Sequence, residues 1–309
     1  MSSYAATLDV CICTFKRQSL AKTLQSISAQ ILPEGQSIRA IVADNDETPS
    51  GETLARETAA RLGLALLYVH APARNISIAR NACLAAAQAP LVAFIDDDEE
   101  AEPGWAAALA GCLEDTGADI AFGPVKAVYD ADTPAWVRRA DMHSFQPRLG
   151  ADGVPETGYT SSVMMRREVI GDLRFDPTLG RSGGEDTVFF HQLSQAGALL
   201  AYCDEAVVTE PVPKSRANLG WLLRRSFRSG QTHGRLLQSL GKSAAGPASS
   251  AAMKALYCGT GAVFTLSSVK RRRALHRGAL HLGVIAYMLG REEGEIYGAV
   301  GAPAAGEKG

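Results

Sequence analysis

The sequence Leu91-Val-Ala-Phe-Ile95-Asp96-Asp97-Asp98 joins an apolar run to three aspartates, and two glutamates follow at once. Five apolar residues of this kind predict a buried strand of a parallel sheet. Adjacent carboxylates repel one another, and a divalent cation shared with phosphate oxygens would offset that repulsion. The run therefore predicts a metal site at the carboxyl end of a strand. The alternative is a solvated acidic turn leading into a helix, since acidic side chains favour helix N-termini.

Strand-like and helix-like segments alternate around this run, which predicts a parallel sheet covered by helices on both faces. Expected strands occupy residues 8–13, 38–42, 64–69, 91–95, 120–128, 161–165 and 199–208. Expected helices occupy residues 19–30, 52–62, 77–88, 105–113 and 187–196, with more helix after residue 218. Residues 130–158 are expected to form a long loop and residues 243–250 a break. Ligands of such folds bind beyond the carboxyl ends of the strands, so the chemistry is expected there.

The charge of the chain is unevenly distributed although its total is only −2. Residues 1–204 have 16 Lys and Arg against 27 Asp and Glu, whereas residues 205–309 have 15 against 6. A basic C-terminal third indicates a surface for phosphates, anionic lipid or nucleic acid. No secretory signal and no apolar run long enough to span a bilayer is visible. The six cysteines form no CxxC pair, so free thiols are expected.

Five short motifs follow one another, each after an expected strand or at an expected helix start. They are Cys11-Ile-Cys-Thr-Phe-Lys-Arg17, Asp44-Asn45, Asn75-Ile-Ser-Ile-Ala-Arg-Asn81, Phe94-Ile-Asp-Asp-Asp98 and Gly183-Gly-Glu-Asp186. In this order they resemble the family 2 inverting glycosyltransferases of the GT-A fold over about residues 8–230. Within that family the chain is similar to bacterial exopolysaccharide glucosyltransferases of the succinoglycan type.

The resemblance implies an α/β fold with a Rossmann-like, mostly parallel sheet flanked by helices. It implies a catalytic domain at residues 1–240, with a nucleotide-sugar half at 1–100 and an acceptor half at 101–240. A helical, basic C-terminal region would occupy residues 241–309.

The resemblance places the donor site on side chains that follow the first four strands or begin the third helix. The residues it implies for nucleotide-sugar binding are Thr14, Phe15, Arg17, Asp44, Arg80, Asp96 and Asp97. Asp44 would accept a hydrogen bond from uracil, Asp96 would contact the ribose or the sugar, and Asp97 would support its neighbours. The structural alternatives are a helix cap at Thr14, a surface charge at Arg17 and a salt bridge from Arg80 to an acidic loop. Glu99 and Glu100 are expected to lead into a helix.

The metal and the catalytic base are implied by the two acidic motifs. Asp98 would bind Mn2+ or Mg2+, which bridges the two phosphates of the donor and stabilises the departing diphosphate. Asp186, next to Glu185, would be the base that deprotonates the acceptor hydroxyl as it attacks the anomeric carbon. A single displacement of this kind inverts the configuration of the sugar. The alternative is that Glu185 or Asp186 caps the helix that follows.

The C-terminal third holds a basic segment and two apolar stretches. The basic segment is linked by the resemblance to acceptor or diphosphate binding, with a solvated helix face as the alternative, and its residues are Trp221, Arg224, Arg225 and Arg228. The QxxRW motif of processive family members is missing. Apolar stretches at 251–267 and 278–290 flank Lys270-Arg-Arg-Arg273. This pattern fits a peripheral, monotopic contact with anionic lipid or an ordinary helical hairpin on the catalytic domain.

The predicted activity is transfer of a sugar, with glucose preferred, from a UDP-sugar to a saccharide acceptor. The acceptor is expected to be lipid-linked, at the cytoplasmic face of a bacterial membrane, in exopolysaccharide or surface polysaccharide synthesis. One alternative is a sugar nucleotidyltransferase, but that class favours a glycine-rich first loop and residues 14–17 contain no glycine. A second alternative is a non-catalytic module that binds membrane or nucleic acid. The acidic body argues against nucleic acid as a partner.

Overall fold

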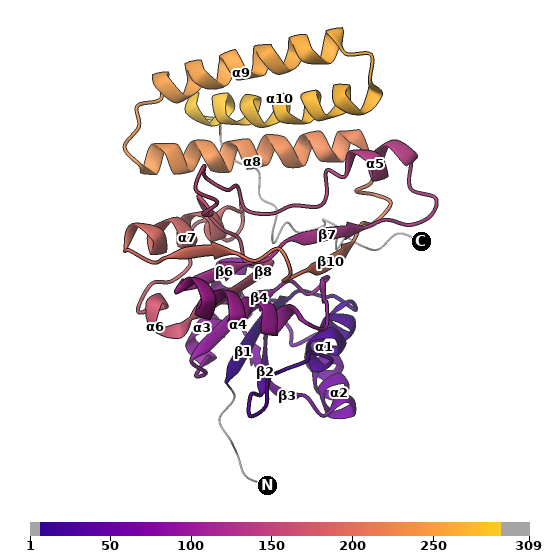
Figure 1. Ribbon diagram of the computed structural model, residues 1–309, viewed down its shortest axis with the longest axis vertical. Coiled ribbons are helices and arrows are strands. Elements are labelled where there is room, and N and C mark those ends of the chain that lie inside the picture. The colour runs from indigo at the N-terminus through magenta and orange to yellow at the C-terminus, as the bar shows by residue number, and fades with distance from the viewer. Residues whose placement is uncertain (1–6, 292–309) are drawn as a thin grey trace.

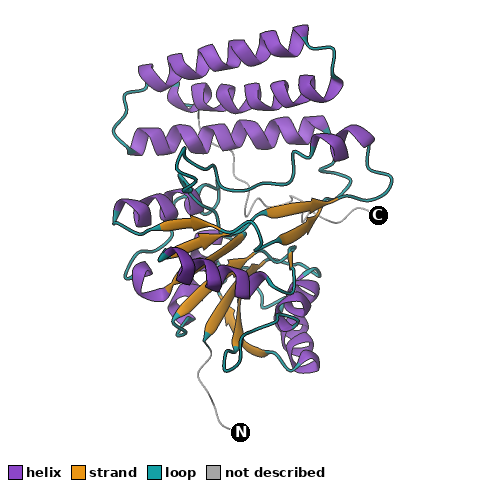
Figure 2. Ribbon diagram, viewed as in Figure 1, coloured by secondary structure: helices purple, strands orange, loops and turns teal. Residues whose placement is uncertain are grey.

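The computed structural model describes residues 7–291, and a seven-stranded sheet forms its centre (Figure 1, Figure 2). The strand order is β3-β2-β1-β4-β8-β6-β9, in which β8 runs antiparallel to both of its neighbours and the other pairs are parallel. The strands are β1 Leu8–Thr14, β2 Ile38–Asp44, β3 Ala65–His70, β4 Leu91–Ile95, β6 Ile120–Phe122, β8 Ser162–Arg166 and β9 Leu200–Tyr202. The expected mostly parallel α/β sheet is confirmed.

Helices cover both faces of the sheet because its strands are apolar on both sides. Successive residues of a strand point to opposite faces, so Val10 and Ile12 of β1 enter one core while Cys11 enters the other. The first core is covered by α1 Leu20–Ser28, α2 Glu52–Leu62 and α4 Trp105–Thr116. The second is covered by α3 Ile76–Ala86, α6 Arg167–Ile170 and α7 Glu185–Gln195. All six cysteines are free, as expected.

The structure contains a second, three-stranded sheet, and two of the expected strands are therefore wrong. Residues 120–128 and 199–208 were expected to be single strands, but each segment is divided between the two sheets. The second sheet has the order β5-β10-β7, with β5 Glu100–Ala101, β7 Val125–Val128 and β10 Val208–Pro211. The chain leaves the central sheet at Gly123-Pro124, where proline has no amide hydrogen and a side chain on Gly123 would overlap the carbonyl of Ala206.

Three long helices form a layer beyond the second sheet (Figure 1). They are α8 Leu219–Ser239, α9 Ala245–Phe264 and α10 Ser268–Met288, and α10 packs against both of the others. Gly230 of α8 and Gly283 of α10 permit the close approach, since a Cβ on either would overlap the backbone of the facing helix. The break expected at 243–250 is wrong beyond residue 244, because α9 begins at Ala245. Pro247 lies in the first turn of this helix, where its missing N–H costs little.

The loop expected at 130–158 contains one short helix, α5 Ala135–Ala140. Helix α10 packs on α5 as well as on the other two helices of the layer. Within residues 7–291, none of the helices combines the length and the hydropathy needed to cross a bilayer.

Candidate active site

A cavity of about 780 Å³ lies at the carboxyl ends of the central strands, and α8 forms part of its wall. Its lining comes from the loop after β1, the turn after β4, the first turns of α3 and α7, strand β10 and one face of α8. Twelve residues singled out from the sequence line this one cavity: Thr14, Phe15, Arg17, Arg80, Asp96, Asp97, Asp98, Glu185, Asp186, Trp221, Arg225 and Arg228. The tertiary structure therefore brings the acidic run, the acidic pair and the basic segment together.

The side chains of Asp97 and Asp98 are held by residues of the loop after β1. Thr14 donates a hydrogen bond of 2.7 Å from Oγ1 to Oδ2 of Asp97. The Arg17 guanidinium lies 3.1 Å from Oδ2 of Asp98 and 4.0 Å from Oδ1 of Asp97. Burial, and then the negative charge of Asp98, raise the pKa of Asp97 to about 7. Thr14 and Arg17 are thus tied to the acidic turn, and neither helix capping nor a free surface charge describes them.

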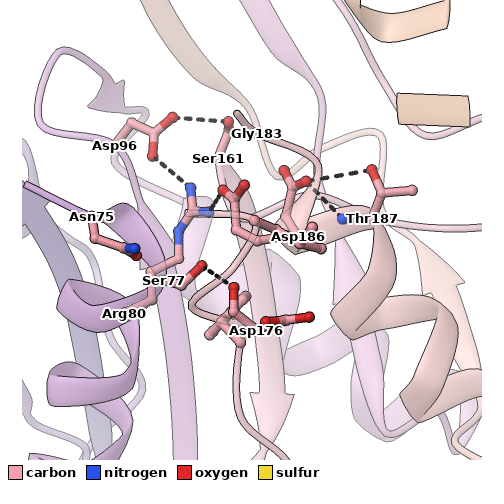
Figure 3. A network of polar contacts seen from close by, with 12 residues as sticks. Asn75, Ser77, Arg80, Asp96, Ser161, Asp176, Gly183, Asp186 and Thr187 are labelled. Atoms are coloured by element: carbon pink, nitrogen blue, oxygen red, sulfur yellow. Dashed lines mark hydrogen bonds and ion pairs between the residues drawn. The ribbon is translucent and has the colours of Figure 1, made fainter. Parts of the chain in front are cut away.

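Asp96 begins the acidic turn and faces the opposite wall of the cavity. Its Oδ2 accepts a hydrogen bond of 3.1 Å from Ser161, and its Oδ1 lies 3.9 Å from the Arg80 guanidinium (Figure 3). Its backbone N–H donates to the carboxylate of Glu99, which is 1% exposed. The expectation that Glu99 and Glu100 lead into a helix is therefore wrong. The buried carboxylate of Glu99 accepts the hydrogen bond that closes the turn, and Glu100 belongs to β5.

The donor chemistry of this turn fits a hard divalent cation. Carboxylate oxygens of Asp96, Asp98 and Glu210 line the cavity, and Mg2+ or Mn2+ takes oxygen ligands. Among the residues that the structure describes, no three acidic, His or Cys side chains are arranged to hold a metal by themselves. A cation here would complete its ligands with phosphate and water, which is the usual arrangement for magnesium.

A buried ion pair joins α3 to α7. The guanidinium of Arg80 contacts Oε1 of Glu185, and the two side chains are 6% and 4% exposed (Figure 3). Arg80 also lies over the Phe175 ring, 5.6 Å from its centroid. Oε2 of Glu185 is buried without a hydrogen-bond partner in the described residues. Burial first, and the adjacent charge of Asp186 second, raise the pKa of Glu185 to about 7 although Arg80 opposes the shift.

Asp186 lies beside this pair with one oxygen uncommitted. Its Oδ1 accepts hydrogen bonds of 2.6 and 3.3 Å from the backbone N–H and the hydroxyl of Thr187 (Figure 3). Its Oδ2 has no hydrogen-bond partner among residues 7–291. The N-cap position of α7 is Gly184, with a φ of 88° and no side-chain cap. The capping alternative for Glu185 and Asp186 therefore does not describe the structure, and a side chain on Gly184 would collide with Thr232.

Two residues expected at the site lie elsewhere. Asp44 is fully buried and does not line the cavity. Its Oδ1 accepts from the N–H of Asp46, and its Oδ2 accepts from the Gly51 N–H and the Tyr68 hydroxyl, both at 2.7 Å. The neighbouring Asn45 reaches the cavity instead. Arg224 is exposed on α8 and is absent from the lining, although it lies one helical turn before Arg228, which does line the cavity.

The structure adds residues that the sequence reasoning missed, of which Glu210 is the most informative. It lies in β10, faces the acidic turn, and pairs with Arg216 at 3.1 Å. In the sequence, Glu210 is an acidic residue that follows Val207-Val208-Thr209. The expectation of a single strand at 199–208 hid the fact that a separate strand carries this residue. His233 also lines the cavity.

Glu210 predicts a pH dependence of stability. Burial and the charge of Asp98 raise its pKa from an ordinary 4.5 to about 7, so the folded protein holds a proton that the unfolded chain releases. This stabilisation is complete below pH 4.5 and is lost as the pH rises through 7, on the order of 3 kcal/mol in total. Glu210→Gln cannot lose the proton, so its thermal midpoint should fall less than that of the wild type between pH 5 and pH 8.

Thermal unfolding in the presence of a chelator would measure this difference. Glu168→Gln, at an exposed glutamate of α6, is the matched control and should leave the pH slope unchanged. An identical slope in Glu210→Gln and the wild type would contradict the assignment.

An aromatic and cationic cluster forms the α8 wall of the cavity. Trp221 stacks on His143 with ring centroids 5.4 Å apart. Arg225 lies over the rings of Trp221 and Phe145, at 5.3 and 5.4 Å from their centroids. This wall combines flat apolar surface with positive charge, which suits a saccharide face or a diphosphate.

Comparison with known proteins identifies the chain. Residues 9–174 match the family model described as glycosyl transferase family 2. The succinoglycan biosynthesis protein ExoM of Rhizobium meliloti is 44% identical over 297 residues, which cover 94% of this chain and 96% of that protein. The chain belongs to glycosyl transferase family 2 and is a glycosyltransferase. A glucosyl-dolichyl phosphate glucuronosyltransferase of Haloferax volcanii is 25% identical, over 72% of this chain and 75% of that protein.

Solved structures share the fold, and the expected GT-A architecture is confirmed. The mannosyltransferase PcManGT of Pyrobaculum calidifontis, solved with GDP-Man and Mn2+, superimposes with a TM-score of 0.61 at 20% identity. That match covers 94% of this chain and 89% of PcManGT. The S. aureus TarS 1-349 structure gives a TM-score of 0.53 at 14% identity, covering 94% and 98% of the two chains.

Proposed function

We propose that this glycosyltransferase moves glucose from UDP-glucose to a lipid-linked saccharide in exopolysaccharide synthesis. The observation that carries the proposal is that the acidic turn after β4 and the uncommitted oxygen of Asp186 face one cavity. The similarity to ExoM along nearly the whole chain supports the exopolysaccharide context. Family membership sets aside the two alternatives, a sugar nucleotidyltransferase and a non-catalytic binding module.

The donor would lie across the carboxyl ends of β1 and β4. Thr14, Phe15 and Arg17 would surround the nucleotide, and Arg17 can exchange its contact with Asp98 for the diphosphate. Asp96 would accept hydrogen bonds from the ribose or the sugar, with Asp97 fixed beneath it by Thr14. Asp44 would act indirectly, since its hydrogen bonds shape the loop that presents Asn45.

Asp186 would be the catalytic base. Its Oδ1 is held by Thr187, which leaves Oδ2 to accept the proton of the acceptor hydroxyl. The charge of Glu185 is balanced by Arg80, so the pair would orient the start of α7 and with it Asp186. Attack of the acceptor oxygen from the face opposite the diphosphate inverts the anomeric carbon, so an α-linked donor gives a β-linked product.

A divalent cation, Mn2+ or Mg2+, would be held by Asp98. When bound it would neutralise the diphosphate as the glycosidic bond breaks. Arg17 lies 3.1 Å from Asp98, and its guanidinium would bind the diphosphate beside this cation.

Asp98→Asn is expected to weaken metal-dependent donor binding by about tenfold or more, because an amide is a poorer ligand for a hard cation than a carboxylate. Isothermal titration of UDP, with and without Mn2+, measures this loss independently of turnover. Asp172→Asn, at an exposed aspartate outside the cavity, serves as the control. An unchanged Mn2+ dependence in Asp98→Asn would exclude Asp98 as the ligand.

The acceptor would enter beside the α8 wall. Trp221, Arg225 and Arg228 would contact its sugars or the departing diphosphate, and the exposed Arg224 would not. A lipid-linked acceptor would require peripheral contact with the inner face of the cell membrane by the helices within residues 241–291, whereas residues 292–309 of the expected C-terminal region lie outside the described residues. We propose accordingly that residues 1–240 form the catalytic domain, with a donor half at 1–100 and an acceptor half at 101–240.

The direct test is incubation with Mn2+, a panel of sugar nucleotides and lipid-linked saccharides extracted from an exopolysaccharide-producing bacterium. Release of UDP, with gain of one hexose by the acceptor, is the expected result with UDP-glucose. Preference for another sugar nucleotide would overturn the proposed donor, and transfer to water alone under every condition would overturn the proposed acceptor.

A further inference from the structure

The helical layer has an unusual charge. Residues 211–291 contain 14 Lys and Arg and no Asp or Glu. This segment covers α8, α9 and α10 entirely. Such a concentration of positive charge attracts polyanionic surfaces and repels a second copy of itself.

The layer is a stack in which α10 lies between α8 and α9 (Figure 1). Arg225 and Thr232 of α8 line the cavity, whereas Gly230 and Gly234 on its opposite side pack on α10. Helix α10 in turn meets α8 through Gly283 and meets α9 through Gly278, on opposite sides. Of the three helices in the layer, α9 is therefore the farthest from the active site.

The outward face of α9 is apolar, and no segment within residues 7–291 covers it. Its inward face packs on α10 through small residues, among them Ala251, Cys258 and Ala262, which are buried. The side directly opposite carries large apolar side chains, exposed by 70–82%: Met253, Leu256, Tyr257, Val263 and Phe264. Leu266, in the turn that follows, is completely exposed. Lys254 is the single charged residue of α9.

Two arginines of the basic run at 270–273 contact α5. The Arg273 guanidinium donates to the carbonyl oxygen of Ala140 at 2.8 Å, and Arg272 lies 4.5 Å from the centroid of the Trp136 ring. These contacts attach α10 to α5. Arg271 donates to the carbonyl oxygen of Thr265 at 3.0 Å, at the end of α9. The apolar face of α9 is thus a better candidate for lipid contact than this run alone.

We propose that the outward face of α9 inserts into the interfacial region of an anionic bilayer. The positive charge of the layer supplies attraction to the lipid headgroups, and the apolar side chains enter the acyl boundary. A second copy of the chain is disfavoured as the occupant, because pairing through α9 would bring two positively charged layers together. The proposal deepens the membrane contact proposed above, but its test requires no catalysis.

The stack also determines how far the acceptor must reach. Packed helix axes lie about 8–10 Å apart, so three helices hold the cavity roughly 30 Å from the bilayer. A lipid-linked acceptor must cross this distance to reach Asp186. An oligosaccharide of several sugars can do so, whereas a single sugar on a lipid diphosphate is too short.

Vesicle co-sedimentation tests the lipid contact with the full chain. Wild-type protein should pellet with phosphatidylcholine vesicles that contain phosphatidylglycerol, and less with phosphatidylcholine alone. Leu256→Ser combined with Phe264→Ser should lower the partition coefficient by about tenfold or more, since two large apolar side chains no longer enter the interface. Both side chains are exposed, so the thermal midpoint should be unchanged. Ile31→Ser removes an equally exposed apolar side chain from the catalytic half and should bind like the wild type.

Three results would overturn the proposal. Equal binding by the double variant and the wild type would exclude α9, and would indicate a purely electrostatic polyanion surface if salt abolished it. Failure of the wild type to bind anionic vesicles would exclude the bilayer. Dimers in light scattering that the double variant converts to monomers would identify a second copy as the occupant. Donor binding by titration reports separately on the proposed function, which can fail or hold whichever result is found.

Discussion

Asp186→Asn is expected to reduce sugar transfer by roughly 10²–10⁴-fold, the usual loss when a general base is removed. The amide retains the shape of the side chain and can still accept from Thr187, so the start of α7 should be preserved. It cannot take a proton from the acceptor hydroxyl. Donor binding, measured by titration of UDP-glucose with Mn2+, should therefore be unchanged while turnover falls.

The comparison that makes this result specific is with Glu185→Gln. The Glu185 side chain is 4% exposed and engaged by Arg80, so its replacement should lower stability as well as activity. Asp172→Asn, exposed and remote from the cavity, should behave as the wild type. Full turnover by Asp186→Asn would assign the base to another residue, with Glu185 next to be examined.

Arg80→Ala is expected to lower the free energy of unfolding by about 3–5 kcal/mol, because it leaves Glu185 buried without its counter-charge. The two side chains are 6% and 4% exposed, so water cannot replace the lost partner. Removal of the guanidinium also exposes the Phe175 ring that it covers. Chemical denaturation at pH 8 measures this loss of stability. At that pH the Glu185 of the variant either ionises without a counter-charge or holds a proton that the unfolded chain would release, and both lower stability.

A double replacement separates the charge from the packing. Arg80→Met combined with Glu185→Leu removes both charges and retains apolar volume, so most of the lost stability should return while transfer stays impaired. Arg56→Ala breaks the exposed pair with Glu52 and should cost less than about 1 kcal/mol. If Arg80→Ala cost no more than Arg56→Ala, the buried pair would not support the site.

The sequence was sufficient for the first four strands of the central sheet, β1 to β4, because strand burial and helix periodicity are local properties. The apolar run of β4 and the aspartates after it lie where they were expected, and the strand–helix order predicted the parallel sheet and the edge that carries the cavity. Polar residues after strand ends were correspondingly good predictors of the lining, as Thr14, Arg17 and Asp96 show.

The expectations that were wrong concern residues whose environment is set by segments far away in the sequence. Asp44 follows a strand as Asp96 does, yet Gly51 and Tyr68 turn it inward. Glu99 continues an acidic run but is buried beneath it, where it binds the N–H of Asp96. Glu210 reaches the cavity only because the chain leaves the central sheet after β9 and joins the second sheet as β10.

By itself the sequence determined the α/β order, the strand ends that carry chemistry and the positive charge of the last third, since these follow from neighbouring residues. Only the tertiary structure decided that Arg80 pairs with Glu185, 105 residues away, and that Asp186 keeps an oxygen free beside them. It also decided which face of α9 is uncovered. Pairing, burial and exposure are relations between elements that meet on folding, and no local pattern of residues contains them.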